Sequence, residues 1–308
     1  MIKESDLPSV KGTLSFQAPL APFTWMRVGG PAGAVFRPRD ENDLANFLKN
    51  KPDNIPYMVI GAASNLIIRD GGLPDTVVIR LGKAFRKLEA DAVTISVGAG
   101  QLDLQVARFA AKNGIGGLSF LAGVPGTIGG AVRMNAGAKS SVSNAHIAGG
   151  ETADRLISAR VIDPKGKIHN LTPADMGMSY RHNSLPTDWI VTSAVFEGYP
   201  ENVAKVQSEI SEVLKYREEN QPTKARTCGS TFKNPQGISA WKLIDQAGGR
   251  GLKLGDAEIS SFHCNFLLNL GGASASDLED LGENIRSKVQ QDSGVLLEWE
   301  VQRVGVRP

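Results

Sequence analysis

The chain has 308 residues, of which 41% are hydrophobic and 21% charged, and its net charge is +2. This length allows about two domains with cores of their own, and the balanced charge gives no reason to expect a nucleic-acid partner. No apolar run approaches the ~18 residues of a membrane span, and the charged N-terminus "MIKESDLPSVKG" does not resemble a signal peptide. Two distant cysteines, Cys228 and Cys264, predict free thiols in a reducing compartment, so we expect a cytoplasmic protein with no membrane partner.

Short apolar runs between glycine turns predict strands in the first half of the chain, at 57–60, 65–70, 76–81 and 93–98. One helix is predicted at 101–114, where Leu102, Val106 and Phe109 share a face and Asn113-Gly114 provides the stop. A hairpin at 156–171 turning at Asp163-Pro164, a helical turn from Thr172-Pro173 and a strand at 188–197 follow.

The second half of the chain predicts helices more clearly than strands. A long amphipathic helix covers 201–220, and further helices are predicted at 239–248 and 276–294, the last capped by Ser274 or Ser276. Strands are predicted at 265–270 and 296–306. The pattern indicates an α+β protein with a glycine-rich binding domain, followed from about residue 204 by a smaller αβ domain.

Two glycine-rich stretches, "GAASNLIIRDGG" at 61–72 and "GLSFLAGVPGTIGGAVRMNAGA" at 117–138, lie in the same half of the chain. Main-chain amides in tight turns bind anions, and glycine lets a diphosphate approach the backbone. The alternative is that both are only tight turns between strands, and the two interpretations stay evenly balanced. The P-loop pattern is absent, and "VGAG" at 97–100 lacks the third glycine and the later acidic residue of a dinucleotide fingerprint. A dinucleotide would therefore be held by another fold.

Six motifs occur in order along the chain: "RVGGPA" at 27–32, "GAASNL" at 61–66, "GLSFLAGVPGTIGGAVRMNAGA" at 117–138, "SYRHNS" at 179–184, "CGSTFKNP" at 228–235 and "LLEWEV" at 296–301. Together they resemble the UDP-N-acetylenolpyruvoylglucosamine reductase family over about residues 22–305. The resemblance implies an FAD-binding domain of the PCMH/vanillyl-alcohol oxidase type with subdomains at 1–87 and 88–203. It further implies a substrate-binding domain at 204–299 and a C-terminal strand at 300–308 that returns to the first subdomain.

The resemblance also implies the reaction. With NADPH as hydride donor and non-covalent FAD, the family reduces the enolpyruvyl ether of UDP-N-acetylenolpyruvoylglucosamine to give UDP-N-acetylmuramate for peptidoglycan synthesis. We expect this small molecule as the partner, a monomeric protein and no metal. The residues expected to bind FAD are Gly61, Ala62, Ala63, Ser64, Asn65, Leu66, Gly123, Val124, Pro125, Gly126, Ile128, Gly129, Gly130, Asn135, Ala136, Gly137 and Ala138.

The chemistry of this reaction requires three kinds of group. Hydride added to the terminal CH2 places charge on the neighbouring carbon, which needs a cation, hydrogen-bond donors and an acid. The resemblance assigns catalytic roles to Arg181, to Ser230 as proton donor and to Glu300. Strand alternation would put Glu298 on the same face as Glu300, so spacing does not choose between them, whereas the resemblance chooses Glu300.

Four further residues are expected at the substrate: Tyr180, which would pack beside Arg181 and position it, Lys233, Asn234 and His263. Histidines 146, 169, 182 and 263 show no ligand spacing, so no metal is predicted. The short segment between Arg181 and Ser230 resembles the family class that lacks an additional loop with a substrate-binding tyrosine.

Two alternative functions remain open. One is a flavin oxidase of the same broad fold, acting on a sugar or a hydroxy acid, in which FAD is often attached through a histidine. The flavin-loop segments offer no well-placed histidine for that attachment, and His146 is the one candidate. The other is a nucleotide-sugar binding protein without flavin.

Overall fold

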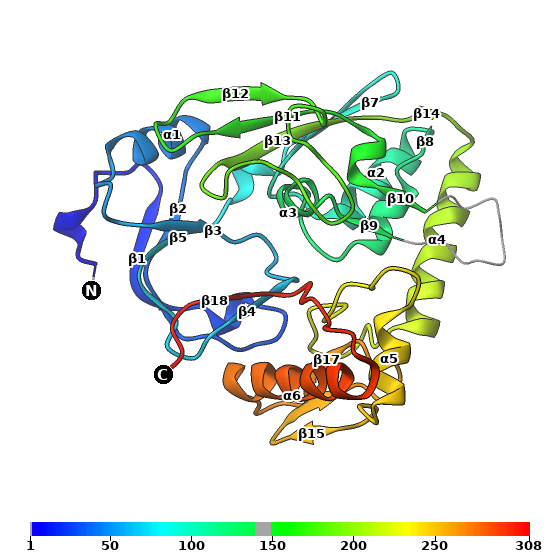
Figure 1. Cartoon of the computed structure of the whole chain (residues 1–308). Helices are drawn as coiled ribbons and strands as arrows, with labels where there is room; N and C mark the ends of the chain where they lie inside the picture. The colour runs from blue at the N-terminus through cyan, green and yellow to red at the C-terminus, as the bar shows by residue number, and fades with distance from the viewer. Residues whose placement is uncertain (1, 139–148) are drawn as a thin grey trace.

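The computed structural model describes residues 2–138 and 149–308. Three larger sheets, of four, five and three strands, occupy separate parts of the molecule, as Figure 1 shows. The four-stranded sheet lies on the left of this view, the five-stranded sheet along the top and the three-stranded sheet at the bottom. The mixed helix and strand content agrees with the predicted α+β class.

The four-stranded sheet is built from the N-terminal part of the chain in the order β1 (Thr13–Pro19), β2 (Pro31–Arg37), β5 (Leu73–Ile79) and β3 (Tyr57–Val59). One of its faces is covered by α1 (Glu41–Asn50), which buries Leu44, Phe47 and Leu48. Asp40 caps α1 by accepting a hydrogen bond from the Asp43 amide. Strands at β3 and β5 were predicted, whereas β1, β2 and α1 were not, although Asp40 is a typical N-cap residue.

The five-stranded sheet is antiparallel throughout and has the order β12 (Ile168–Leu171), β11 (Leu156–Ile162), β13 (Ile190–Glu197), β7 (Thr94–Gly98) and β6 (Leu88–Asp91). This arrangement confirms the predicted hairpin and the strands at 93–98 and 188–197. Three helices share a hydrophobic core with this sheet: α2 (Asp103–Lys112), α3 (Ile128–Met134) and α4 (Val203–Asn220). The predictions of α2 and α4 are confirmed.

The stretch 117–138 contains helical segments and is not a loop throughout. It contains the 3-10 helix η4 (Ser119–Gly123) and the short helix α3, which ends at Asn135 with φ +43°. A Cβ atom on Gly129 would lie 3.1 Å from the Ala99 Cβ, and one on Gly123 would lie 2.5 Å from the Ala138 Cβ. Part of the glycine content therefore permits close packing, in addition to the tight turns and the anion site that the sequence suggested.

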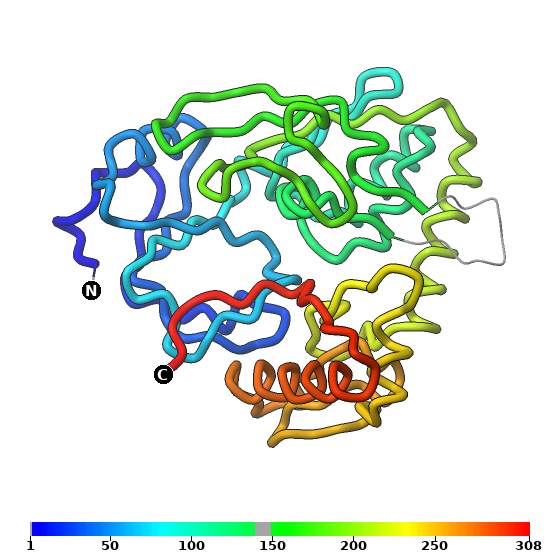
Figure 2. The backbone as a smooth tube through the Cα atoms, viewed as in Figure 1, coloured from blue at the N-terminus to red at the C-terminus, as the bar shows by residue number. Residues whose placement is uncertain are grey.

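The C-terminal unit consists of α5 (Ala240–Gln246), α6 (Ala275–Ser293) and a sheet of β15 (Lys253–Leu254), β16 (Ala257–Ile259) and β17 (Leu267–Asn269). Both helices and β17 were predicted, and Ser274 is the cap of α6. The predicted strand 296–306 is wrong in extent. Only β18 (Gln302–Val304) is regular, and it pairs in parallel with β4 (Leu66–Ile68) of the N-terminal part, a return that Figure 2 shows in red.

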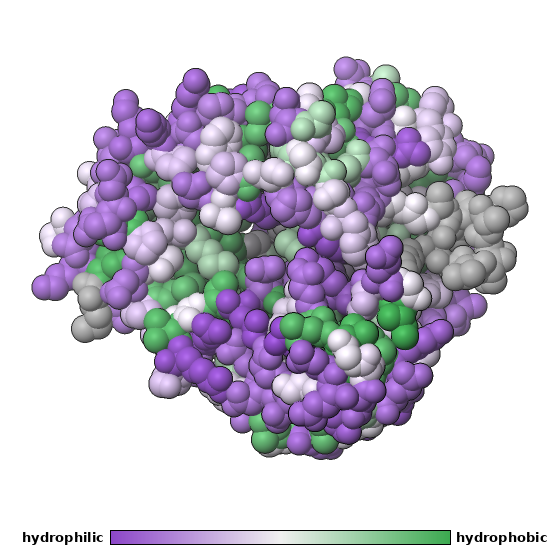
Figure 3. All heavy atoms as spheres, viewed as in Figure 1, coloured by the Kyte–Doolittle hydropathy of each residue, from purple (hydrophilic) through white to green (hydrophobic). Residues whose placement is uncertain are grey.

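The remaining elements are short: η1 (Glu4–Asp6), η2 (Ala21–Phe23), η3 (Lys83–Phe85), η5 (Thr152–Asp154), β8 (Ile115–Gly116), β9 (Gly137–Ala138), β10 (Gly150–Glu151) and β14 (Tyr199–Pro200). Among the described helices, none combines the length and the apolar character that a bilayer crossing demands. Figure 3 shows that hydrophilic residues predominate on the face seen in Figure 1, with apolar residues scattered between them.

Candidate active site

The two glycine-rich loops meet in space. The Ser64 hydroxyl donates a hydrogen bond to the Pro125 carbonyl, and a Cβ atom on Gly61 would lie 2.3 Å from Thr127 Oγ1. Such a distance is below van der Waals contact, so any larger residue at position 61 would require Thr127 to move. The first loop connects β3 to β4, and the second leads into α3. Two segments that the sequence selected separately thus form one structure.

The main-chain amides of these two loops indicate an anionic ligand. In the part of the chain that the structure describes, the amides of residues 61–65 and of Gly126 and Thr127 donate to no protein acceptor. Ala63 has a left-handed backbone with φ +50°, a conformation that non-glycine residues avoid unless the surroundings impose it. Unpartnered amides around such a residue form a concave site for phosphate oxygens. We call this structure, residues 61–66 and 123–130, the cradle, and it fits the diphosphate of a dinucleotide cofactor.

Two of the residues expected to bind FAD use their side chains inside the protein. The side-chain amide of Asn65 donates to the main-chain carbonyl of Glu300 (3.0 Å). The main-chain carbonyl of Asn65 in addition accepts from the main-chain amide of Gln302 (3.0 Å). Asn135, which is 1% exposed, donates to the Ser179 carbonyl (2.9 Å) and accepts from the Ala153 amide (2.9 Å). Both asparagines connect the cofactor loops to segments that carry expected catalytic residues.

Arg181 lies between two carboxylates. Its Nε donates to Glu300 Oε1 (3.3 Å), and its Nη1 lies 3.4 Å from Glu151 Oε1. Its Nη2 donates to the Gly137 carbonyl (2.8 Å), and its backbone has φ +53°. The guanidinium is therefore fixed by contacts within the protein. Glu151 was not predicted, because a single glutamate after a glycine pair gives no local signal.

Glu300 is the carboxyl group that the fold turns inward. Its side chain is 19% exposed, and burial raises its pKa, which outweighs the opposing effects of Arg181 and Lys233. Glu298 is 71% exposed and pairs with the Lys233 ammonium. The irregular backbone before β18 separates these two glutamates, although regular alternation would have put them on one face.

Ser230 lies next to the same segment. Residues 231–233 run antiparallel to 298–300: the Glu300 amide donates to the Thr231 carbonyl (2.9 Å), and the Lys233 amide donates to the Glu298 carbonyl (2.8 Å). The Ser230 side chain is half-buried, and its hydroxyl bonds to no group among the described residues. The fold thus brings the segment that follows Ser230 alongside the segment that carries Glu300.

The other expected substrate residues differ in their surroundings. Tyr180 is 51% exposed, and the Arg181 guanidinium lies 5.0 Å from the centre of its ring, which agrees with the prediction that it packs beside Arg181. Asn234 lines an open pocket with Lys242, and its Oδ1 accepts a hydrogen bond from the Ala240 amide (3.0 Å). His263 Nδ1 accepts from the Asn265 amide (3.2 Å), and burial lowers the pKa of this imidazole.

The cysteines and histidines show no further chemistry. Cys228 and Cys264 are both buried free thiols, and burial raises the pKa of Cys228 to about 12, which agrees with a packing role. Within residues 2–138 and 149–308, no cluster of His, Cys, Asp or Glu could hold a metal ion. His146 lies outside the described residues.

Two family models and several known proteins match the sequence of this chain. The family model described as "UDP-N-acetylenolpyruvoylglucosamine reductase, C-terminal domain" matches residues 221–304, and the model described as "FAD binding domain" matches residues 32–172. The UDP-N-acetylenolpyruvoylglucosamine reductase of Azorhizobium caulinodans is 52% identical over 300 residues, which cover 97% of this chain and 94% of that protein. The enzyme of the same name from Paramagnetospirillum magneticum is 50% identical over 309 residues, covering 99% and 97%.

A solved structure agrees with these matches. The crystal structure of UDP-N-acetylenolpyruvylglucosamine reductase (MurB) from Thermus caldophilus superposes with a TM-score of 0.81 at 34% identity, covering 96% of this chain and all of that one. The similarity therefore extends over the cradle, the Arg181–Glu300 pair and the C-terminal unit together.

Proposed function

The chain belongs to the UDP-N-acetylenolpyruvoylglucosamine reductase family, and we propose that it catalyses the NADPH-dependent, FAD-mediated reduction of UDP-N-acetylenolpyruvoylglucosamine to UDP-N-acetylmuramate in peptidoglycan synthesis. The observation that carries this proposal is the contact between Arg181 and Glu300. The Glu300 segment pairs with the segment that follows Ser230 and is bonded through Asn65 to the amide-lined cradle.

When bound, FAD supplies the redox chemistry by accepting a hydride from NADPH and passing it to the substrate. The chain contributes the binding. The free amides of residues 61–65, Gly126 and Thr127 fit the diphosphate, and the bond between Ser64 and Pro125 holds the two loops of the cradle together. The absence of a side chain at Gly61 lets those loops approach.

Arg181 and Glu300 stabilise the charge that develops on the substrate. Hydride addition at the terminal carbon makes the neighbouring carbon and the carboxylate an enolate. Arg181 presents a fixed positive charge to it, and Glu300 remains protonated to a higher pH than an ordinary glutamate, so it can donate a hydrogen bond. Glu151 and the Gly137 carbonyl hold the guanidinium in place, so little reorganisation is needed when charge appears.

Ser230 delivers the proton that completes the reaction. A free serine is a weak acid, but Lys233, three residues further along the chain, carries a positive charge that would favour proton loss. Its hydroxyl has no protein acceptor to compete with the substrate among the described residues. Tyr180, Lys233, Asn234 and His263 would contact the remainder of the substrate.

The proposed division of the chain follows the sheets. Residues 1–87 and 88–203 hold FAD, residues 204–299 bind substrate, and residues 300–308 return to the N-terminal part of the chain through the pairing of β18 with β4. We propose that the enzyme is a cytoplasmic monomer that acts on this small molecule without a nucleic-acid or membrane partner.

The test follows the flavin absorbance in two anaerobic steps. NADPH should bleach the purified protein, and the enolpyruvyl substrate should then restore the oxidised spectrum without oxygen. A protein with no flavin band would instead be a nucleotide-sugar binding protein. Bleached enzyme that recovers only with oxygen would be an oxidase of the same fold. Acid precipitation of the same sample should release the flavin into the supernatant, because the attachment is non-covalent.

A further inference from the structure

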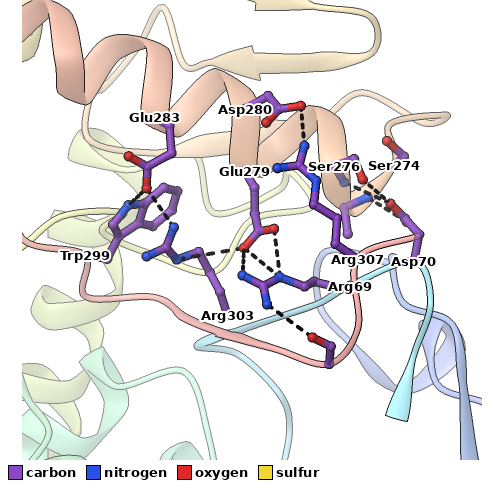
Figure 4. A network of polar contacts seen from close by, with 12 residues as sticks. Arg69, Asp70, Ser274, Ser276, Glu279, Asp280, Glu283, Trp299, Arg303 and Arg307 are labelled. Atoms are coloured by element: carbon purple, nitrogen blue, oxygen red, sulfur yellow. Dashed lines mark hydrogen bonds and ion pairs between the residues drawn. The ribbon is translucent and has the colours of Figure 1, made fainter. Parts of the chain in front are cut away.

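Trp299 precedes Glu300 and is held by helix α6. Its indole Nε1 donates a hydrogen bond to Glu283 Oε1 (2.8 Å), as Figure 4 shows. A Cβ atom on Gly282 would lie 2.2 Å from the indole Cη2 and 2.5 Å from Cζ2, so the ring lies directly on the backbone of α6. A glycine inside a helix costs about 1 kcal/mol relative to alanine, so a space requirement explains its presence here.

The indole also contacts the other segment that carries an expected catalytic residue. The ring centres of Trp299 and Phe232 are 4.8 Å apart, and these two residues form an isolated β-bridge. Phe232 follows Ser230 by two positions. One indole therefore packs between α6 and the serine segment while its own backbone leads into Glu300.

Glu283 also fixes the chain beyond Glu300. Arg303 Nη1 donates to the same Oε1 (2.7 Å), and the Arg303 guanidinium lies 4.3 Å from the centre of the Trp299 ring. Burial acts against the charge of Glu283, but hydrogen bonds from Arg286, Trp299 and Arg303 outweigh it and lower the pKa of this carboxyl. The Oε1 atom of the Glu283 carboxylate thus binds both Trp299 and Arg303, which lie on either side of Glu300 in the sequence.

A second carboxylate anchors this arrangement to the N-terminal part of the chain. Glu279 is one turn before Glu283 on α6, and its side chain is 4% exposed. It accepts hydrogen bonds from Arg69 Nε (3.0 Å) and Nη2 (3.1 Å), and Arg69 directly follows β4. Figure 4 shows the Glu279 and Glu283 carboxylates reaching from α6 toward arginines of the β4 and β18 segments.

We propose that Gly282, Glu283 and Trp299 are positioning residues, which hold Glu300 and Ser230 in register with each other for the substrate half-reaction. The inference rests on the proposed function. It assigns to α6, which contributes no group to the cradle or to the Arg181–Glu300 pair, the task of fixing both segments through one indole ring.

The first test is Glu283→Gln in the flavin-loaded enzyme. The amide keeps the shape but loses the charge that binds Arg303, so the indole and Glu300 gain freedom. Reduction of the flavin by NADPH should stay within about twofold of wild type, whereas reoxidation by the enolpyruvyl substrate should slow by about 10- to 100-fold, as small misplacements of reacting groups do. The pH at which reoxidation declines should also shift, because the pKa of Glu300 depends on its contact with Arg181.

Asp280→Asn is the matched control. Asp280 lies on the same helix and pairs with Arg307 near the C-terminus, but it contacts neither Trp299 nor Arg303. Losing this exposed pair should leave both half-reactions unchanged. Gly282→Ala and Trp299→Phe test the same idea through the ring itself, and both should reproduce the selective loss.

Each outcome decides the matter. If all three variants bind flavin and are reoxidised by substrate at the wild-type rate, the α6 contacts only stabilise the fold and the proposal is wrong. An equal loss in both half-reactions would also overturn it, since positioning affects only the substrate step. If the wild-type enzyme itself is not reoxidised by the substrate, the proposed function fails instead, and the two failures are therefore distinguishable.

Discussion

The cradle and the Arg181–Glu300 centre are built on opposite plans. The cradle uses main-chain amides and small residues, and the glycine at position 61 lets its loops touch. The centre uses long charged side chains, and the contact between Arg181 and Glu300 joins positions 119 residues apart in sequence. A backbone site tolerates changes of side chain as long as the loops can approach, whereas a side-chain site depends on the identity of each group.

This difference predicts two separable phenotypes. Variants of the cradle should lose flavin while the bound fraction reacts normally. Variants of the centre should keep flavin and its reduction by NADPH, but lose the reaction with substrate. Measurements of flavin content and of the rates of both half-reactions would show whether the two phenotypes separate.

The largest effect is expected for Ser230→Ala. The enolate then has no positioned acid, so reoxidation by the enolpyruvyl substrate should fall by about 10²–10⁴-fold or more, the range for general acid catalysis. NADPH should still bleach the flavin at close to the wild-type rate in stopped-flow experiments. Normal reoxidation of this variant would mean that Ser230 is only a turn residue and that the proton comes from elsewhere, with Glu300 the next candidate.

Arg181→Lys comes next. Lysine keeps the charge but cannot contact Glu300, the Gly137 carbonyl and Glu151 in one planar arrangement. We expect turnover to fall by about 10²-fold, as for the loss of an oxyanion donor, with unchanged flavin content. Steady-state kinetics and the flavin-to-protein absorbance ratio provide the measurement, and near-normal turnover would remove Arg181 from the mechanism.

Glu300→Gln should have a smaller effect, about 10-fold, because an amide still donates a hydrogen bond to the enolate. Its signature is in the pH dependence. Burial raises the Glu300 pKa, so the donating, protonated form persists to higher pH and is lost as pH rises through that value. Wild-type reoxidation by substrate should therefore decline with rising pH, and the variant should show no such decline. The same decline in both enzymes would assign it to another group.

Gly61→Ala tests the cradle and should leave the chemistry intact. The added methyl would lie 2.3 Å from Thr127 Oγ1, so the Thr127 side chain or its loop must move. We expect a loss of about 1–3 kcal/mol in stability and weaker flavin retention, with normal half-reactions in the loaded fraction. Thermal unfolding and flavin content after dialysis measure both. Gly82→Ala, where an added Cβ meets nothing within 4 Å, is the control.

The sequence predicted the cradle better than the centre. Both glycine-rich stretches were selected from composition, and they do lie together. Arg181, Ser230 and Glu300 came only from the resemblance, since nothing local distinguishes them from other arginines, serines and glutamates. Glu151 was missed for the same reason, and Glu298 could not be set apart from Glu300.

By itself, the sequence determined the elements whose signals are local. These are the helices with 3.6-residue periodicity, the hairpin at its Asp-Pro turn, and the loops in which glycine frees the backbone. The tertiary structure alone decided which carboxyl group faces Arg181, that Asn65 and Asn135 act as scaffolds, and that α6 holds Trp299. These contacts join residues far apart in the chain. The direction of the Glu300 side chain depends on the irregular backbone before β18, where strand alternation no longer determines it.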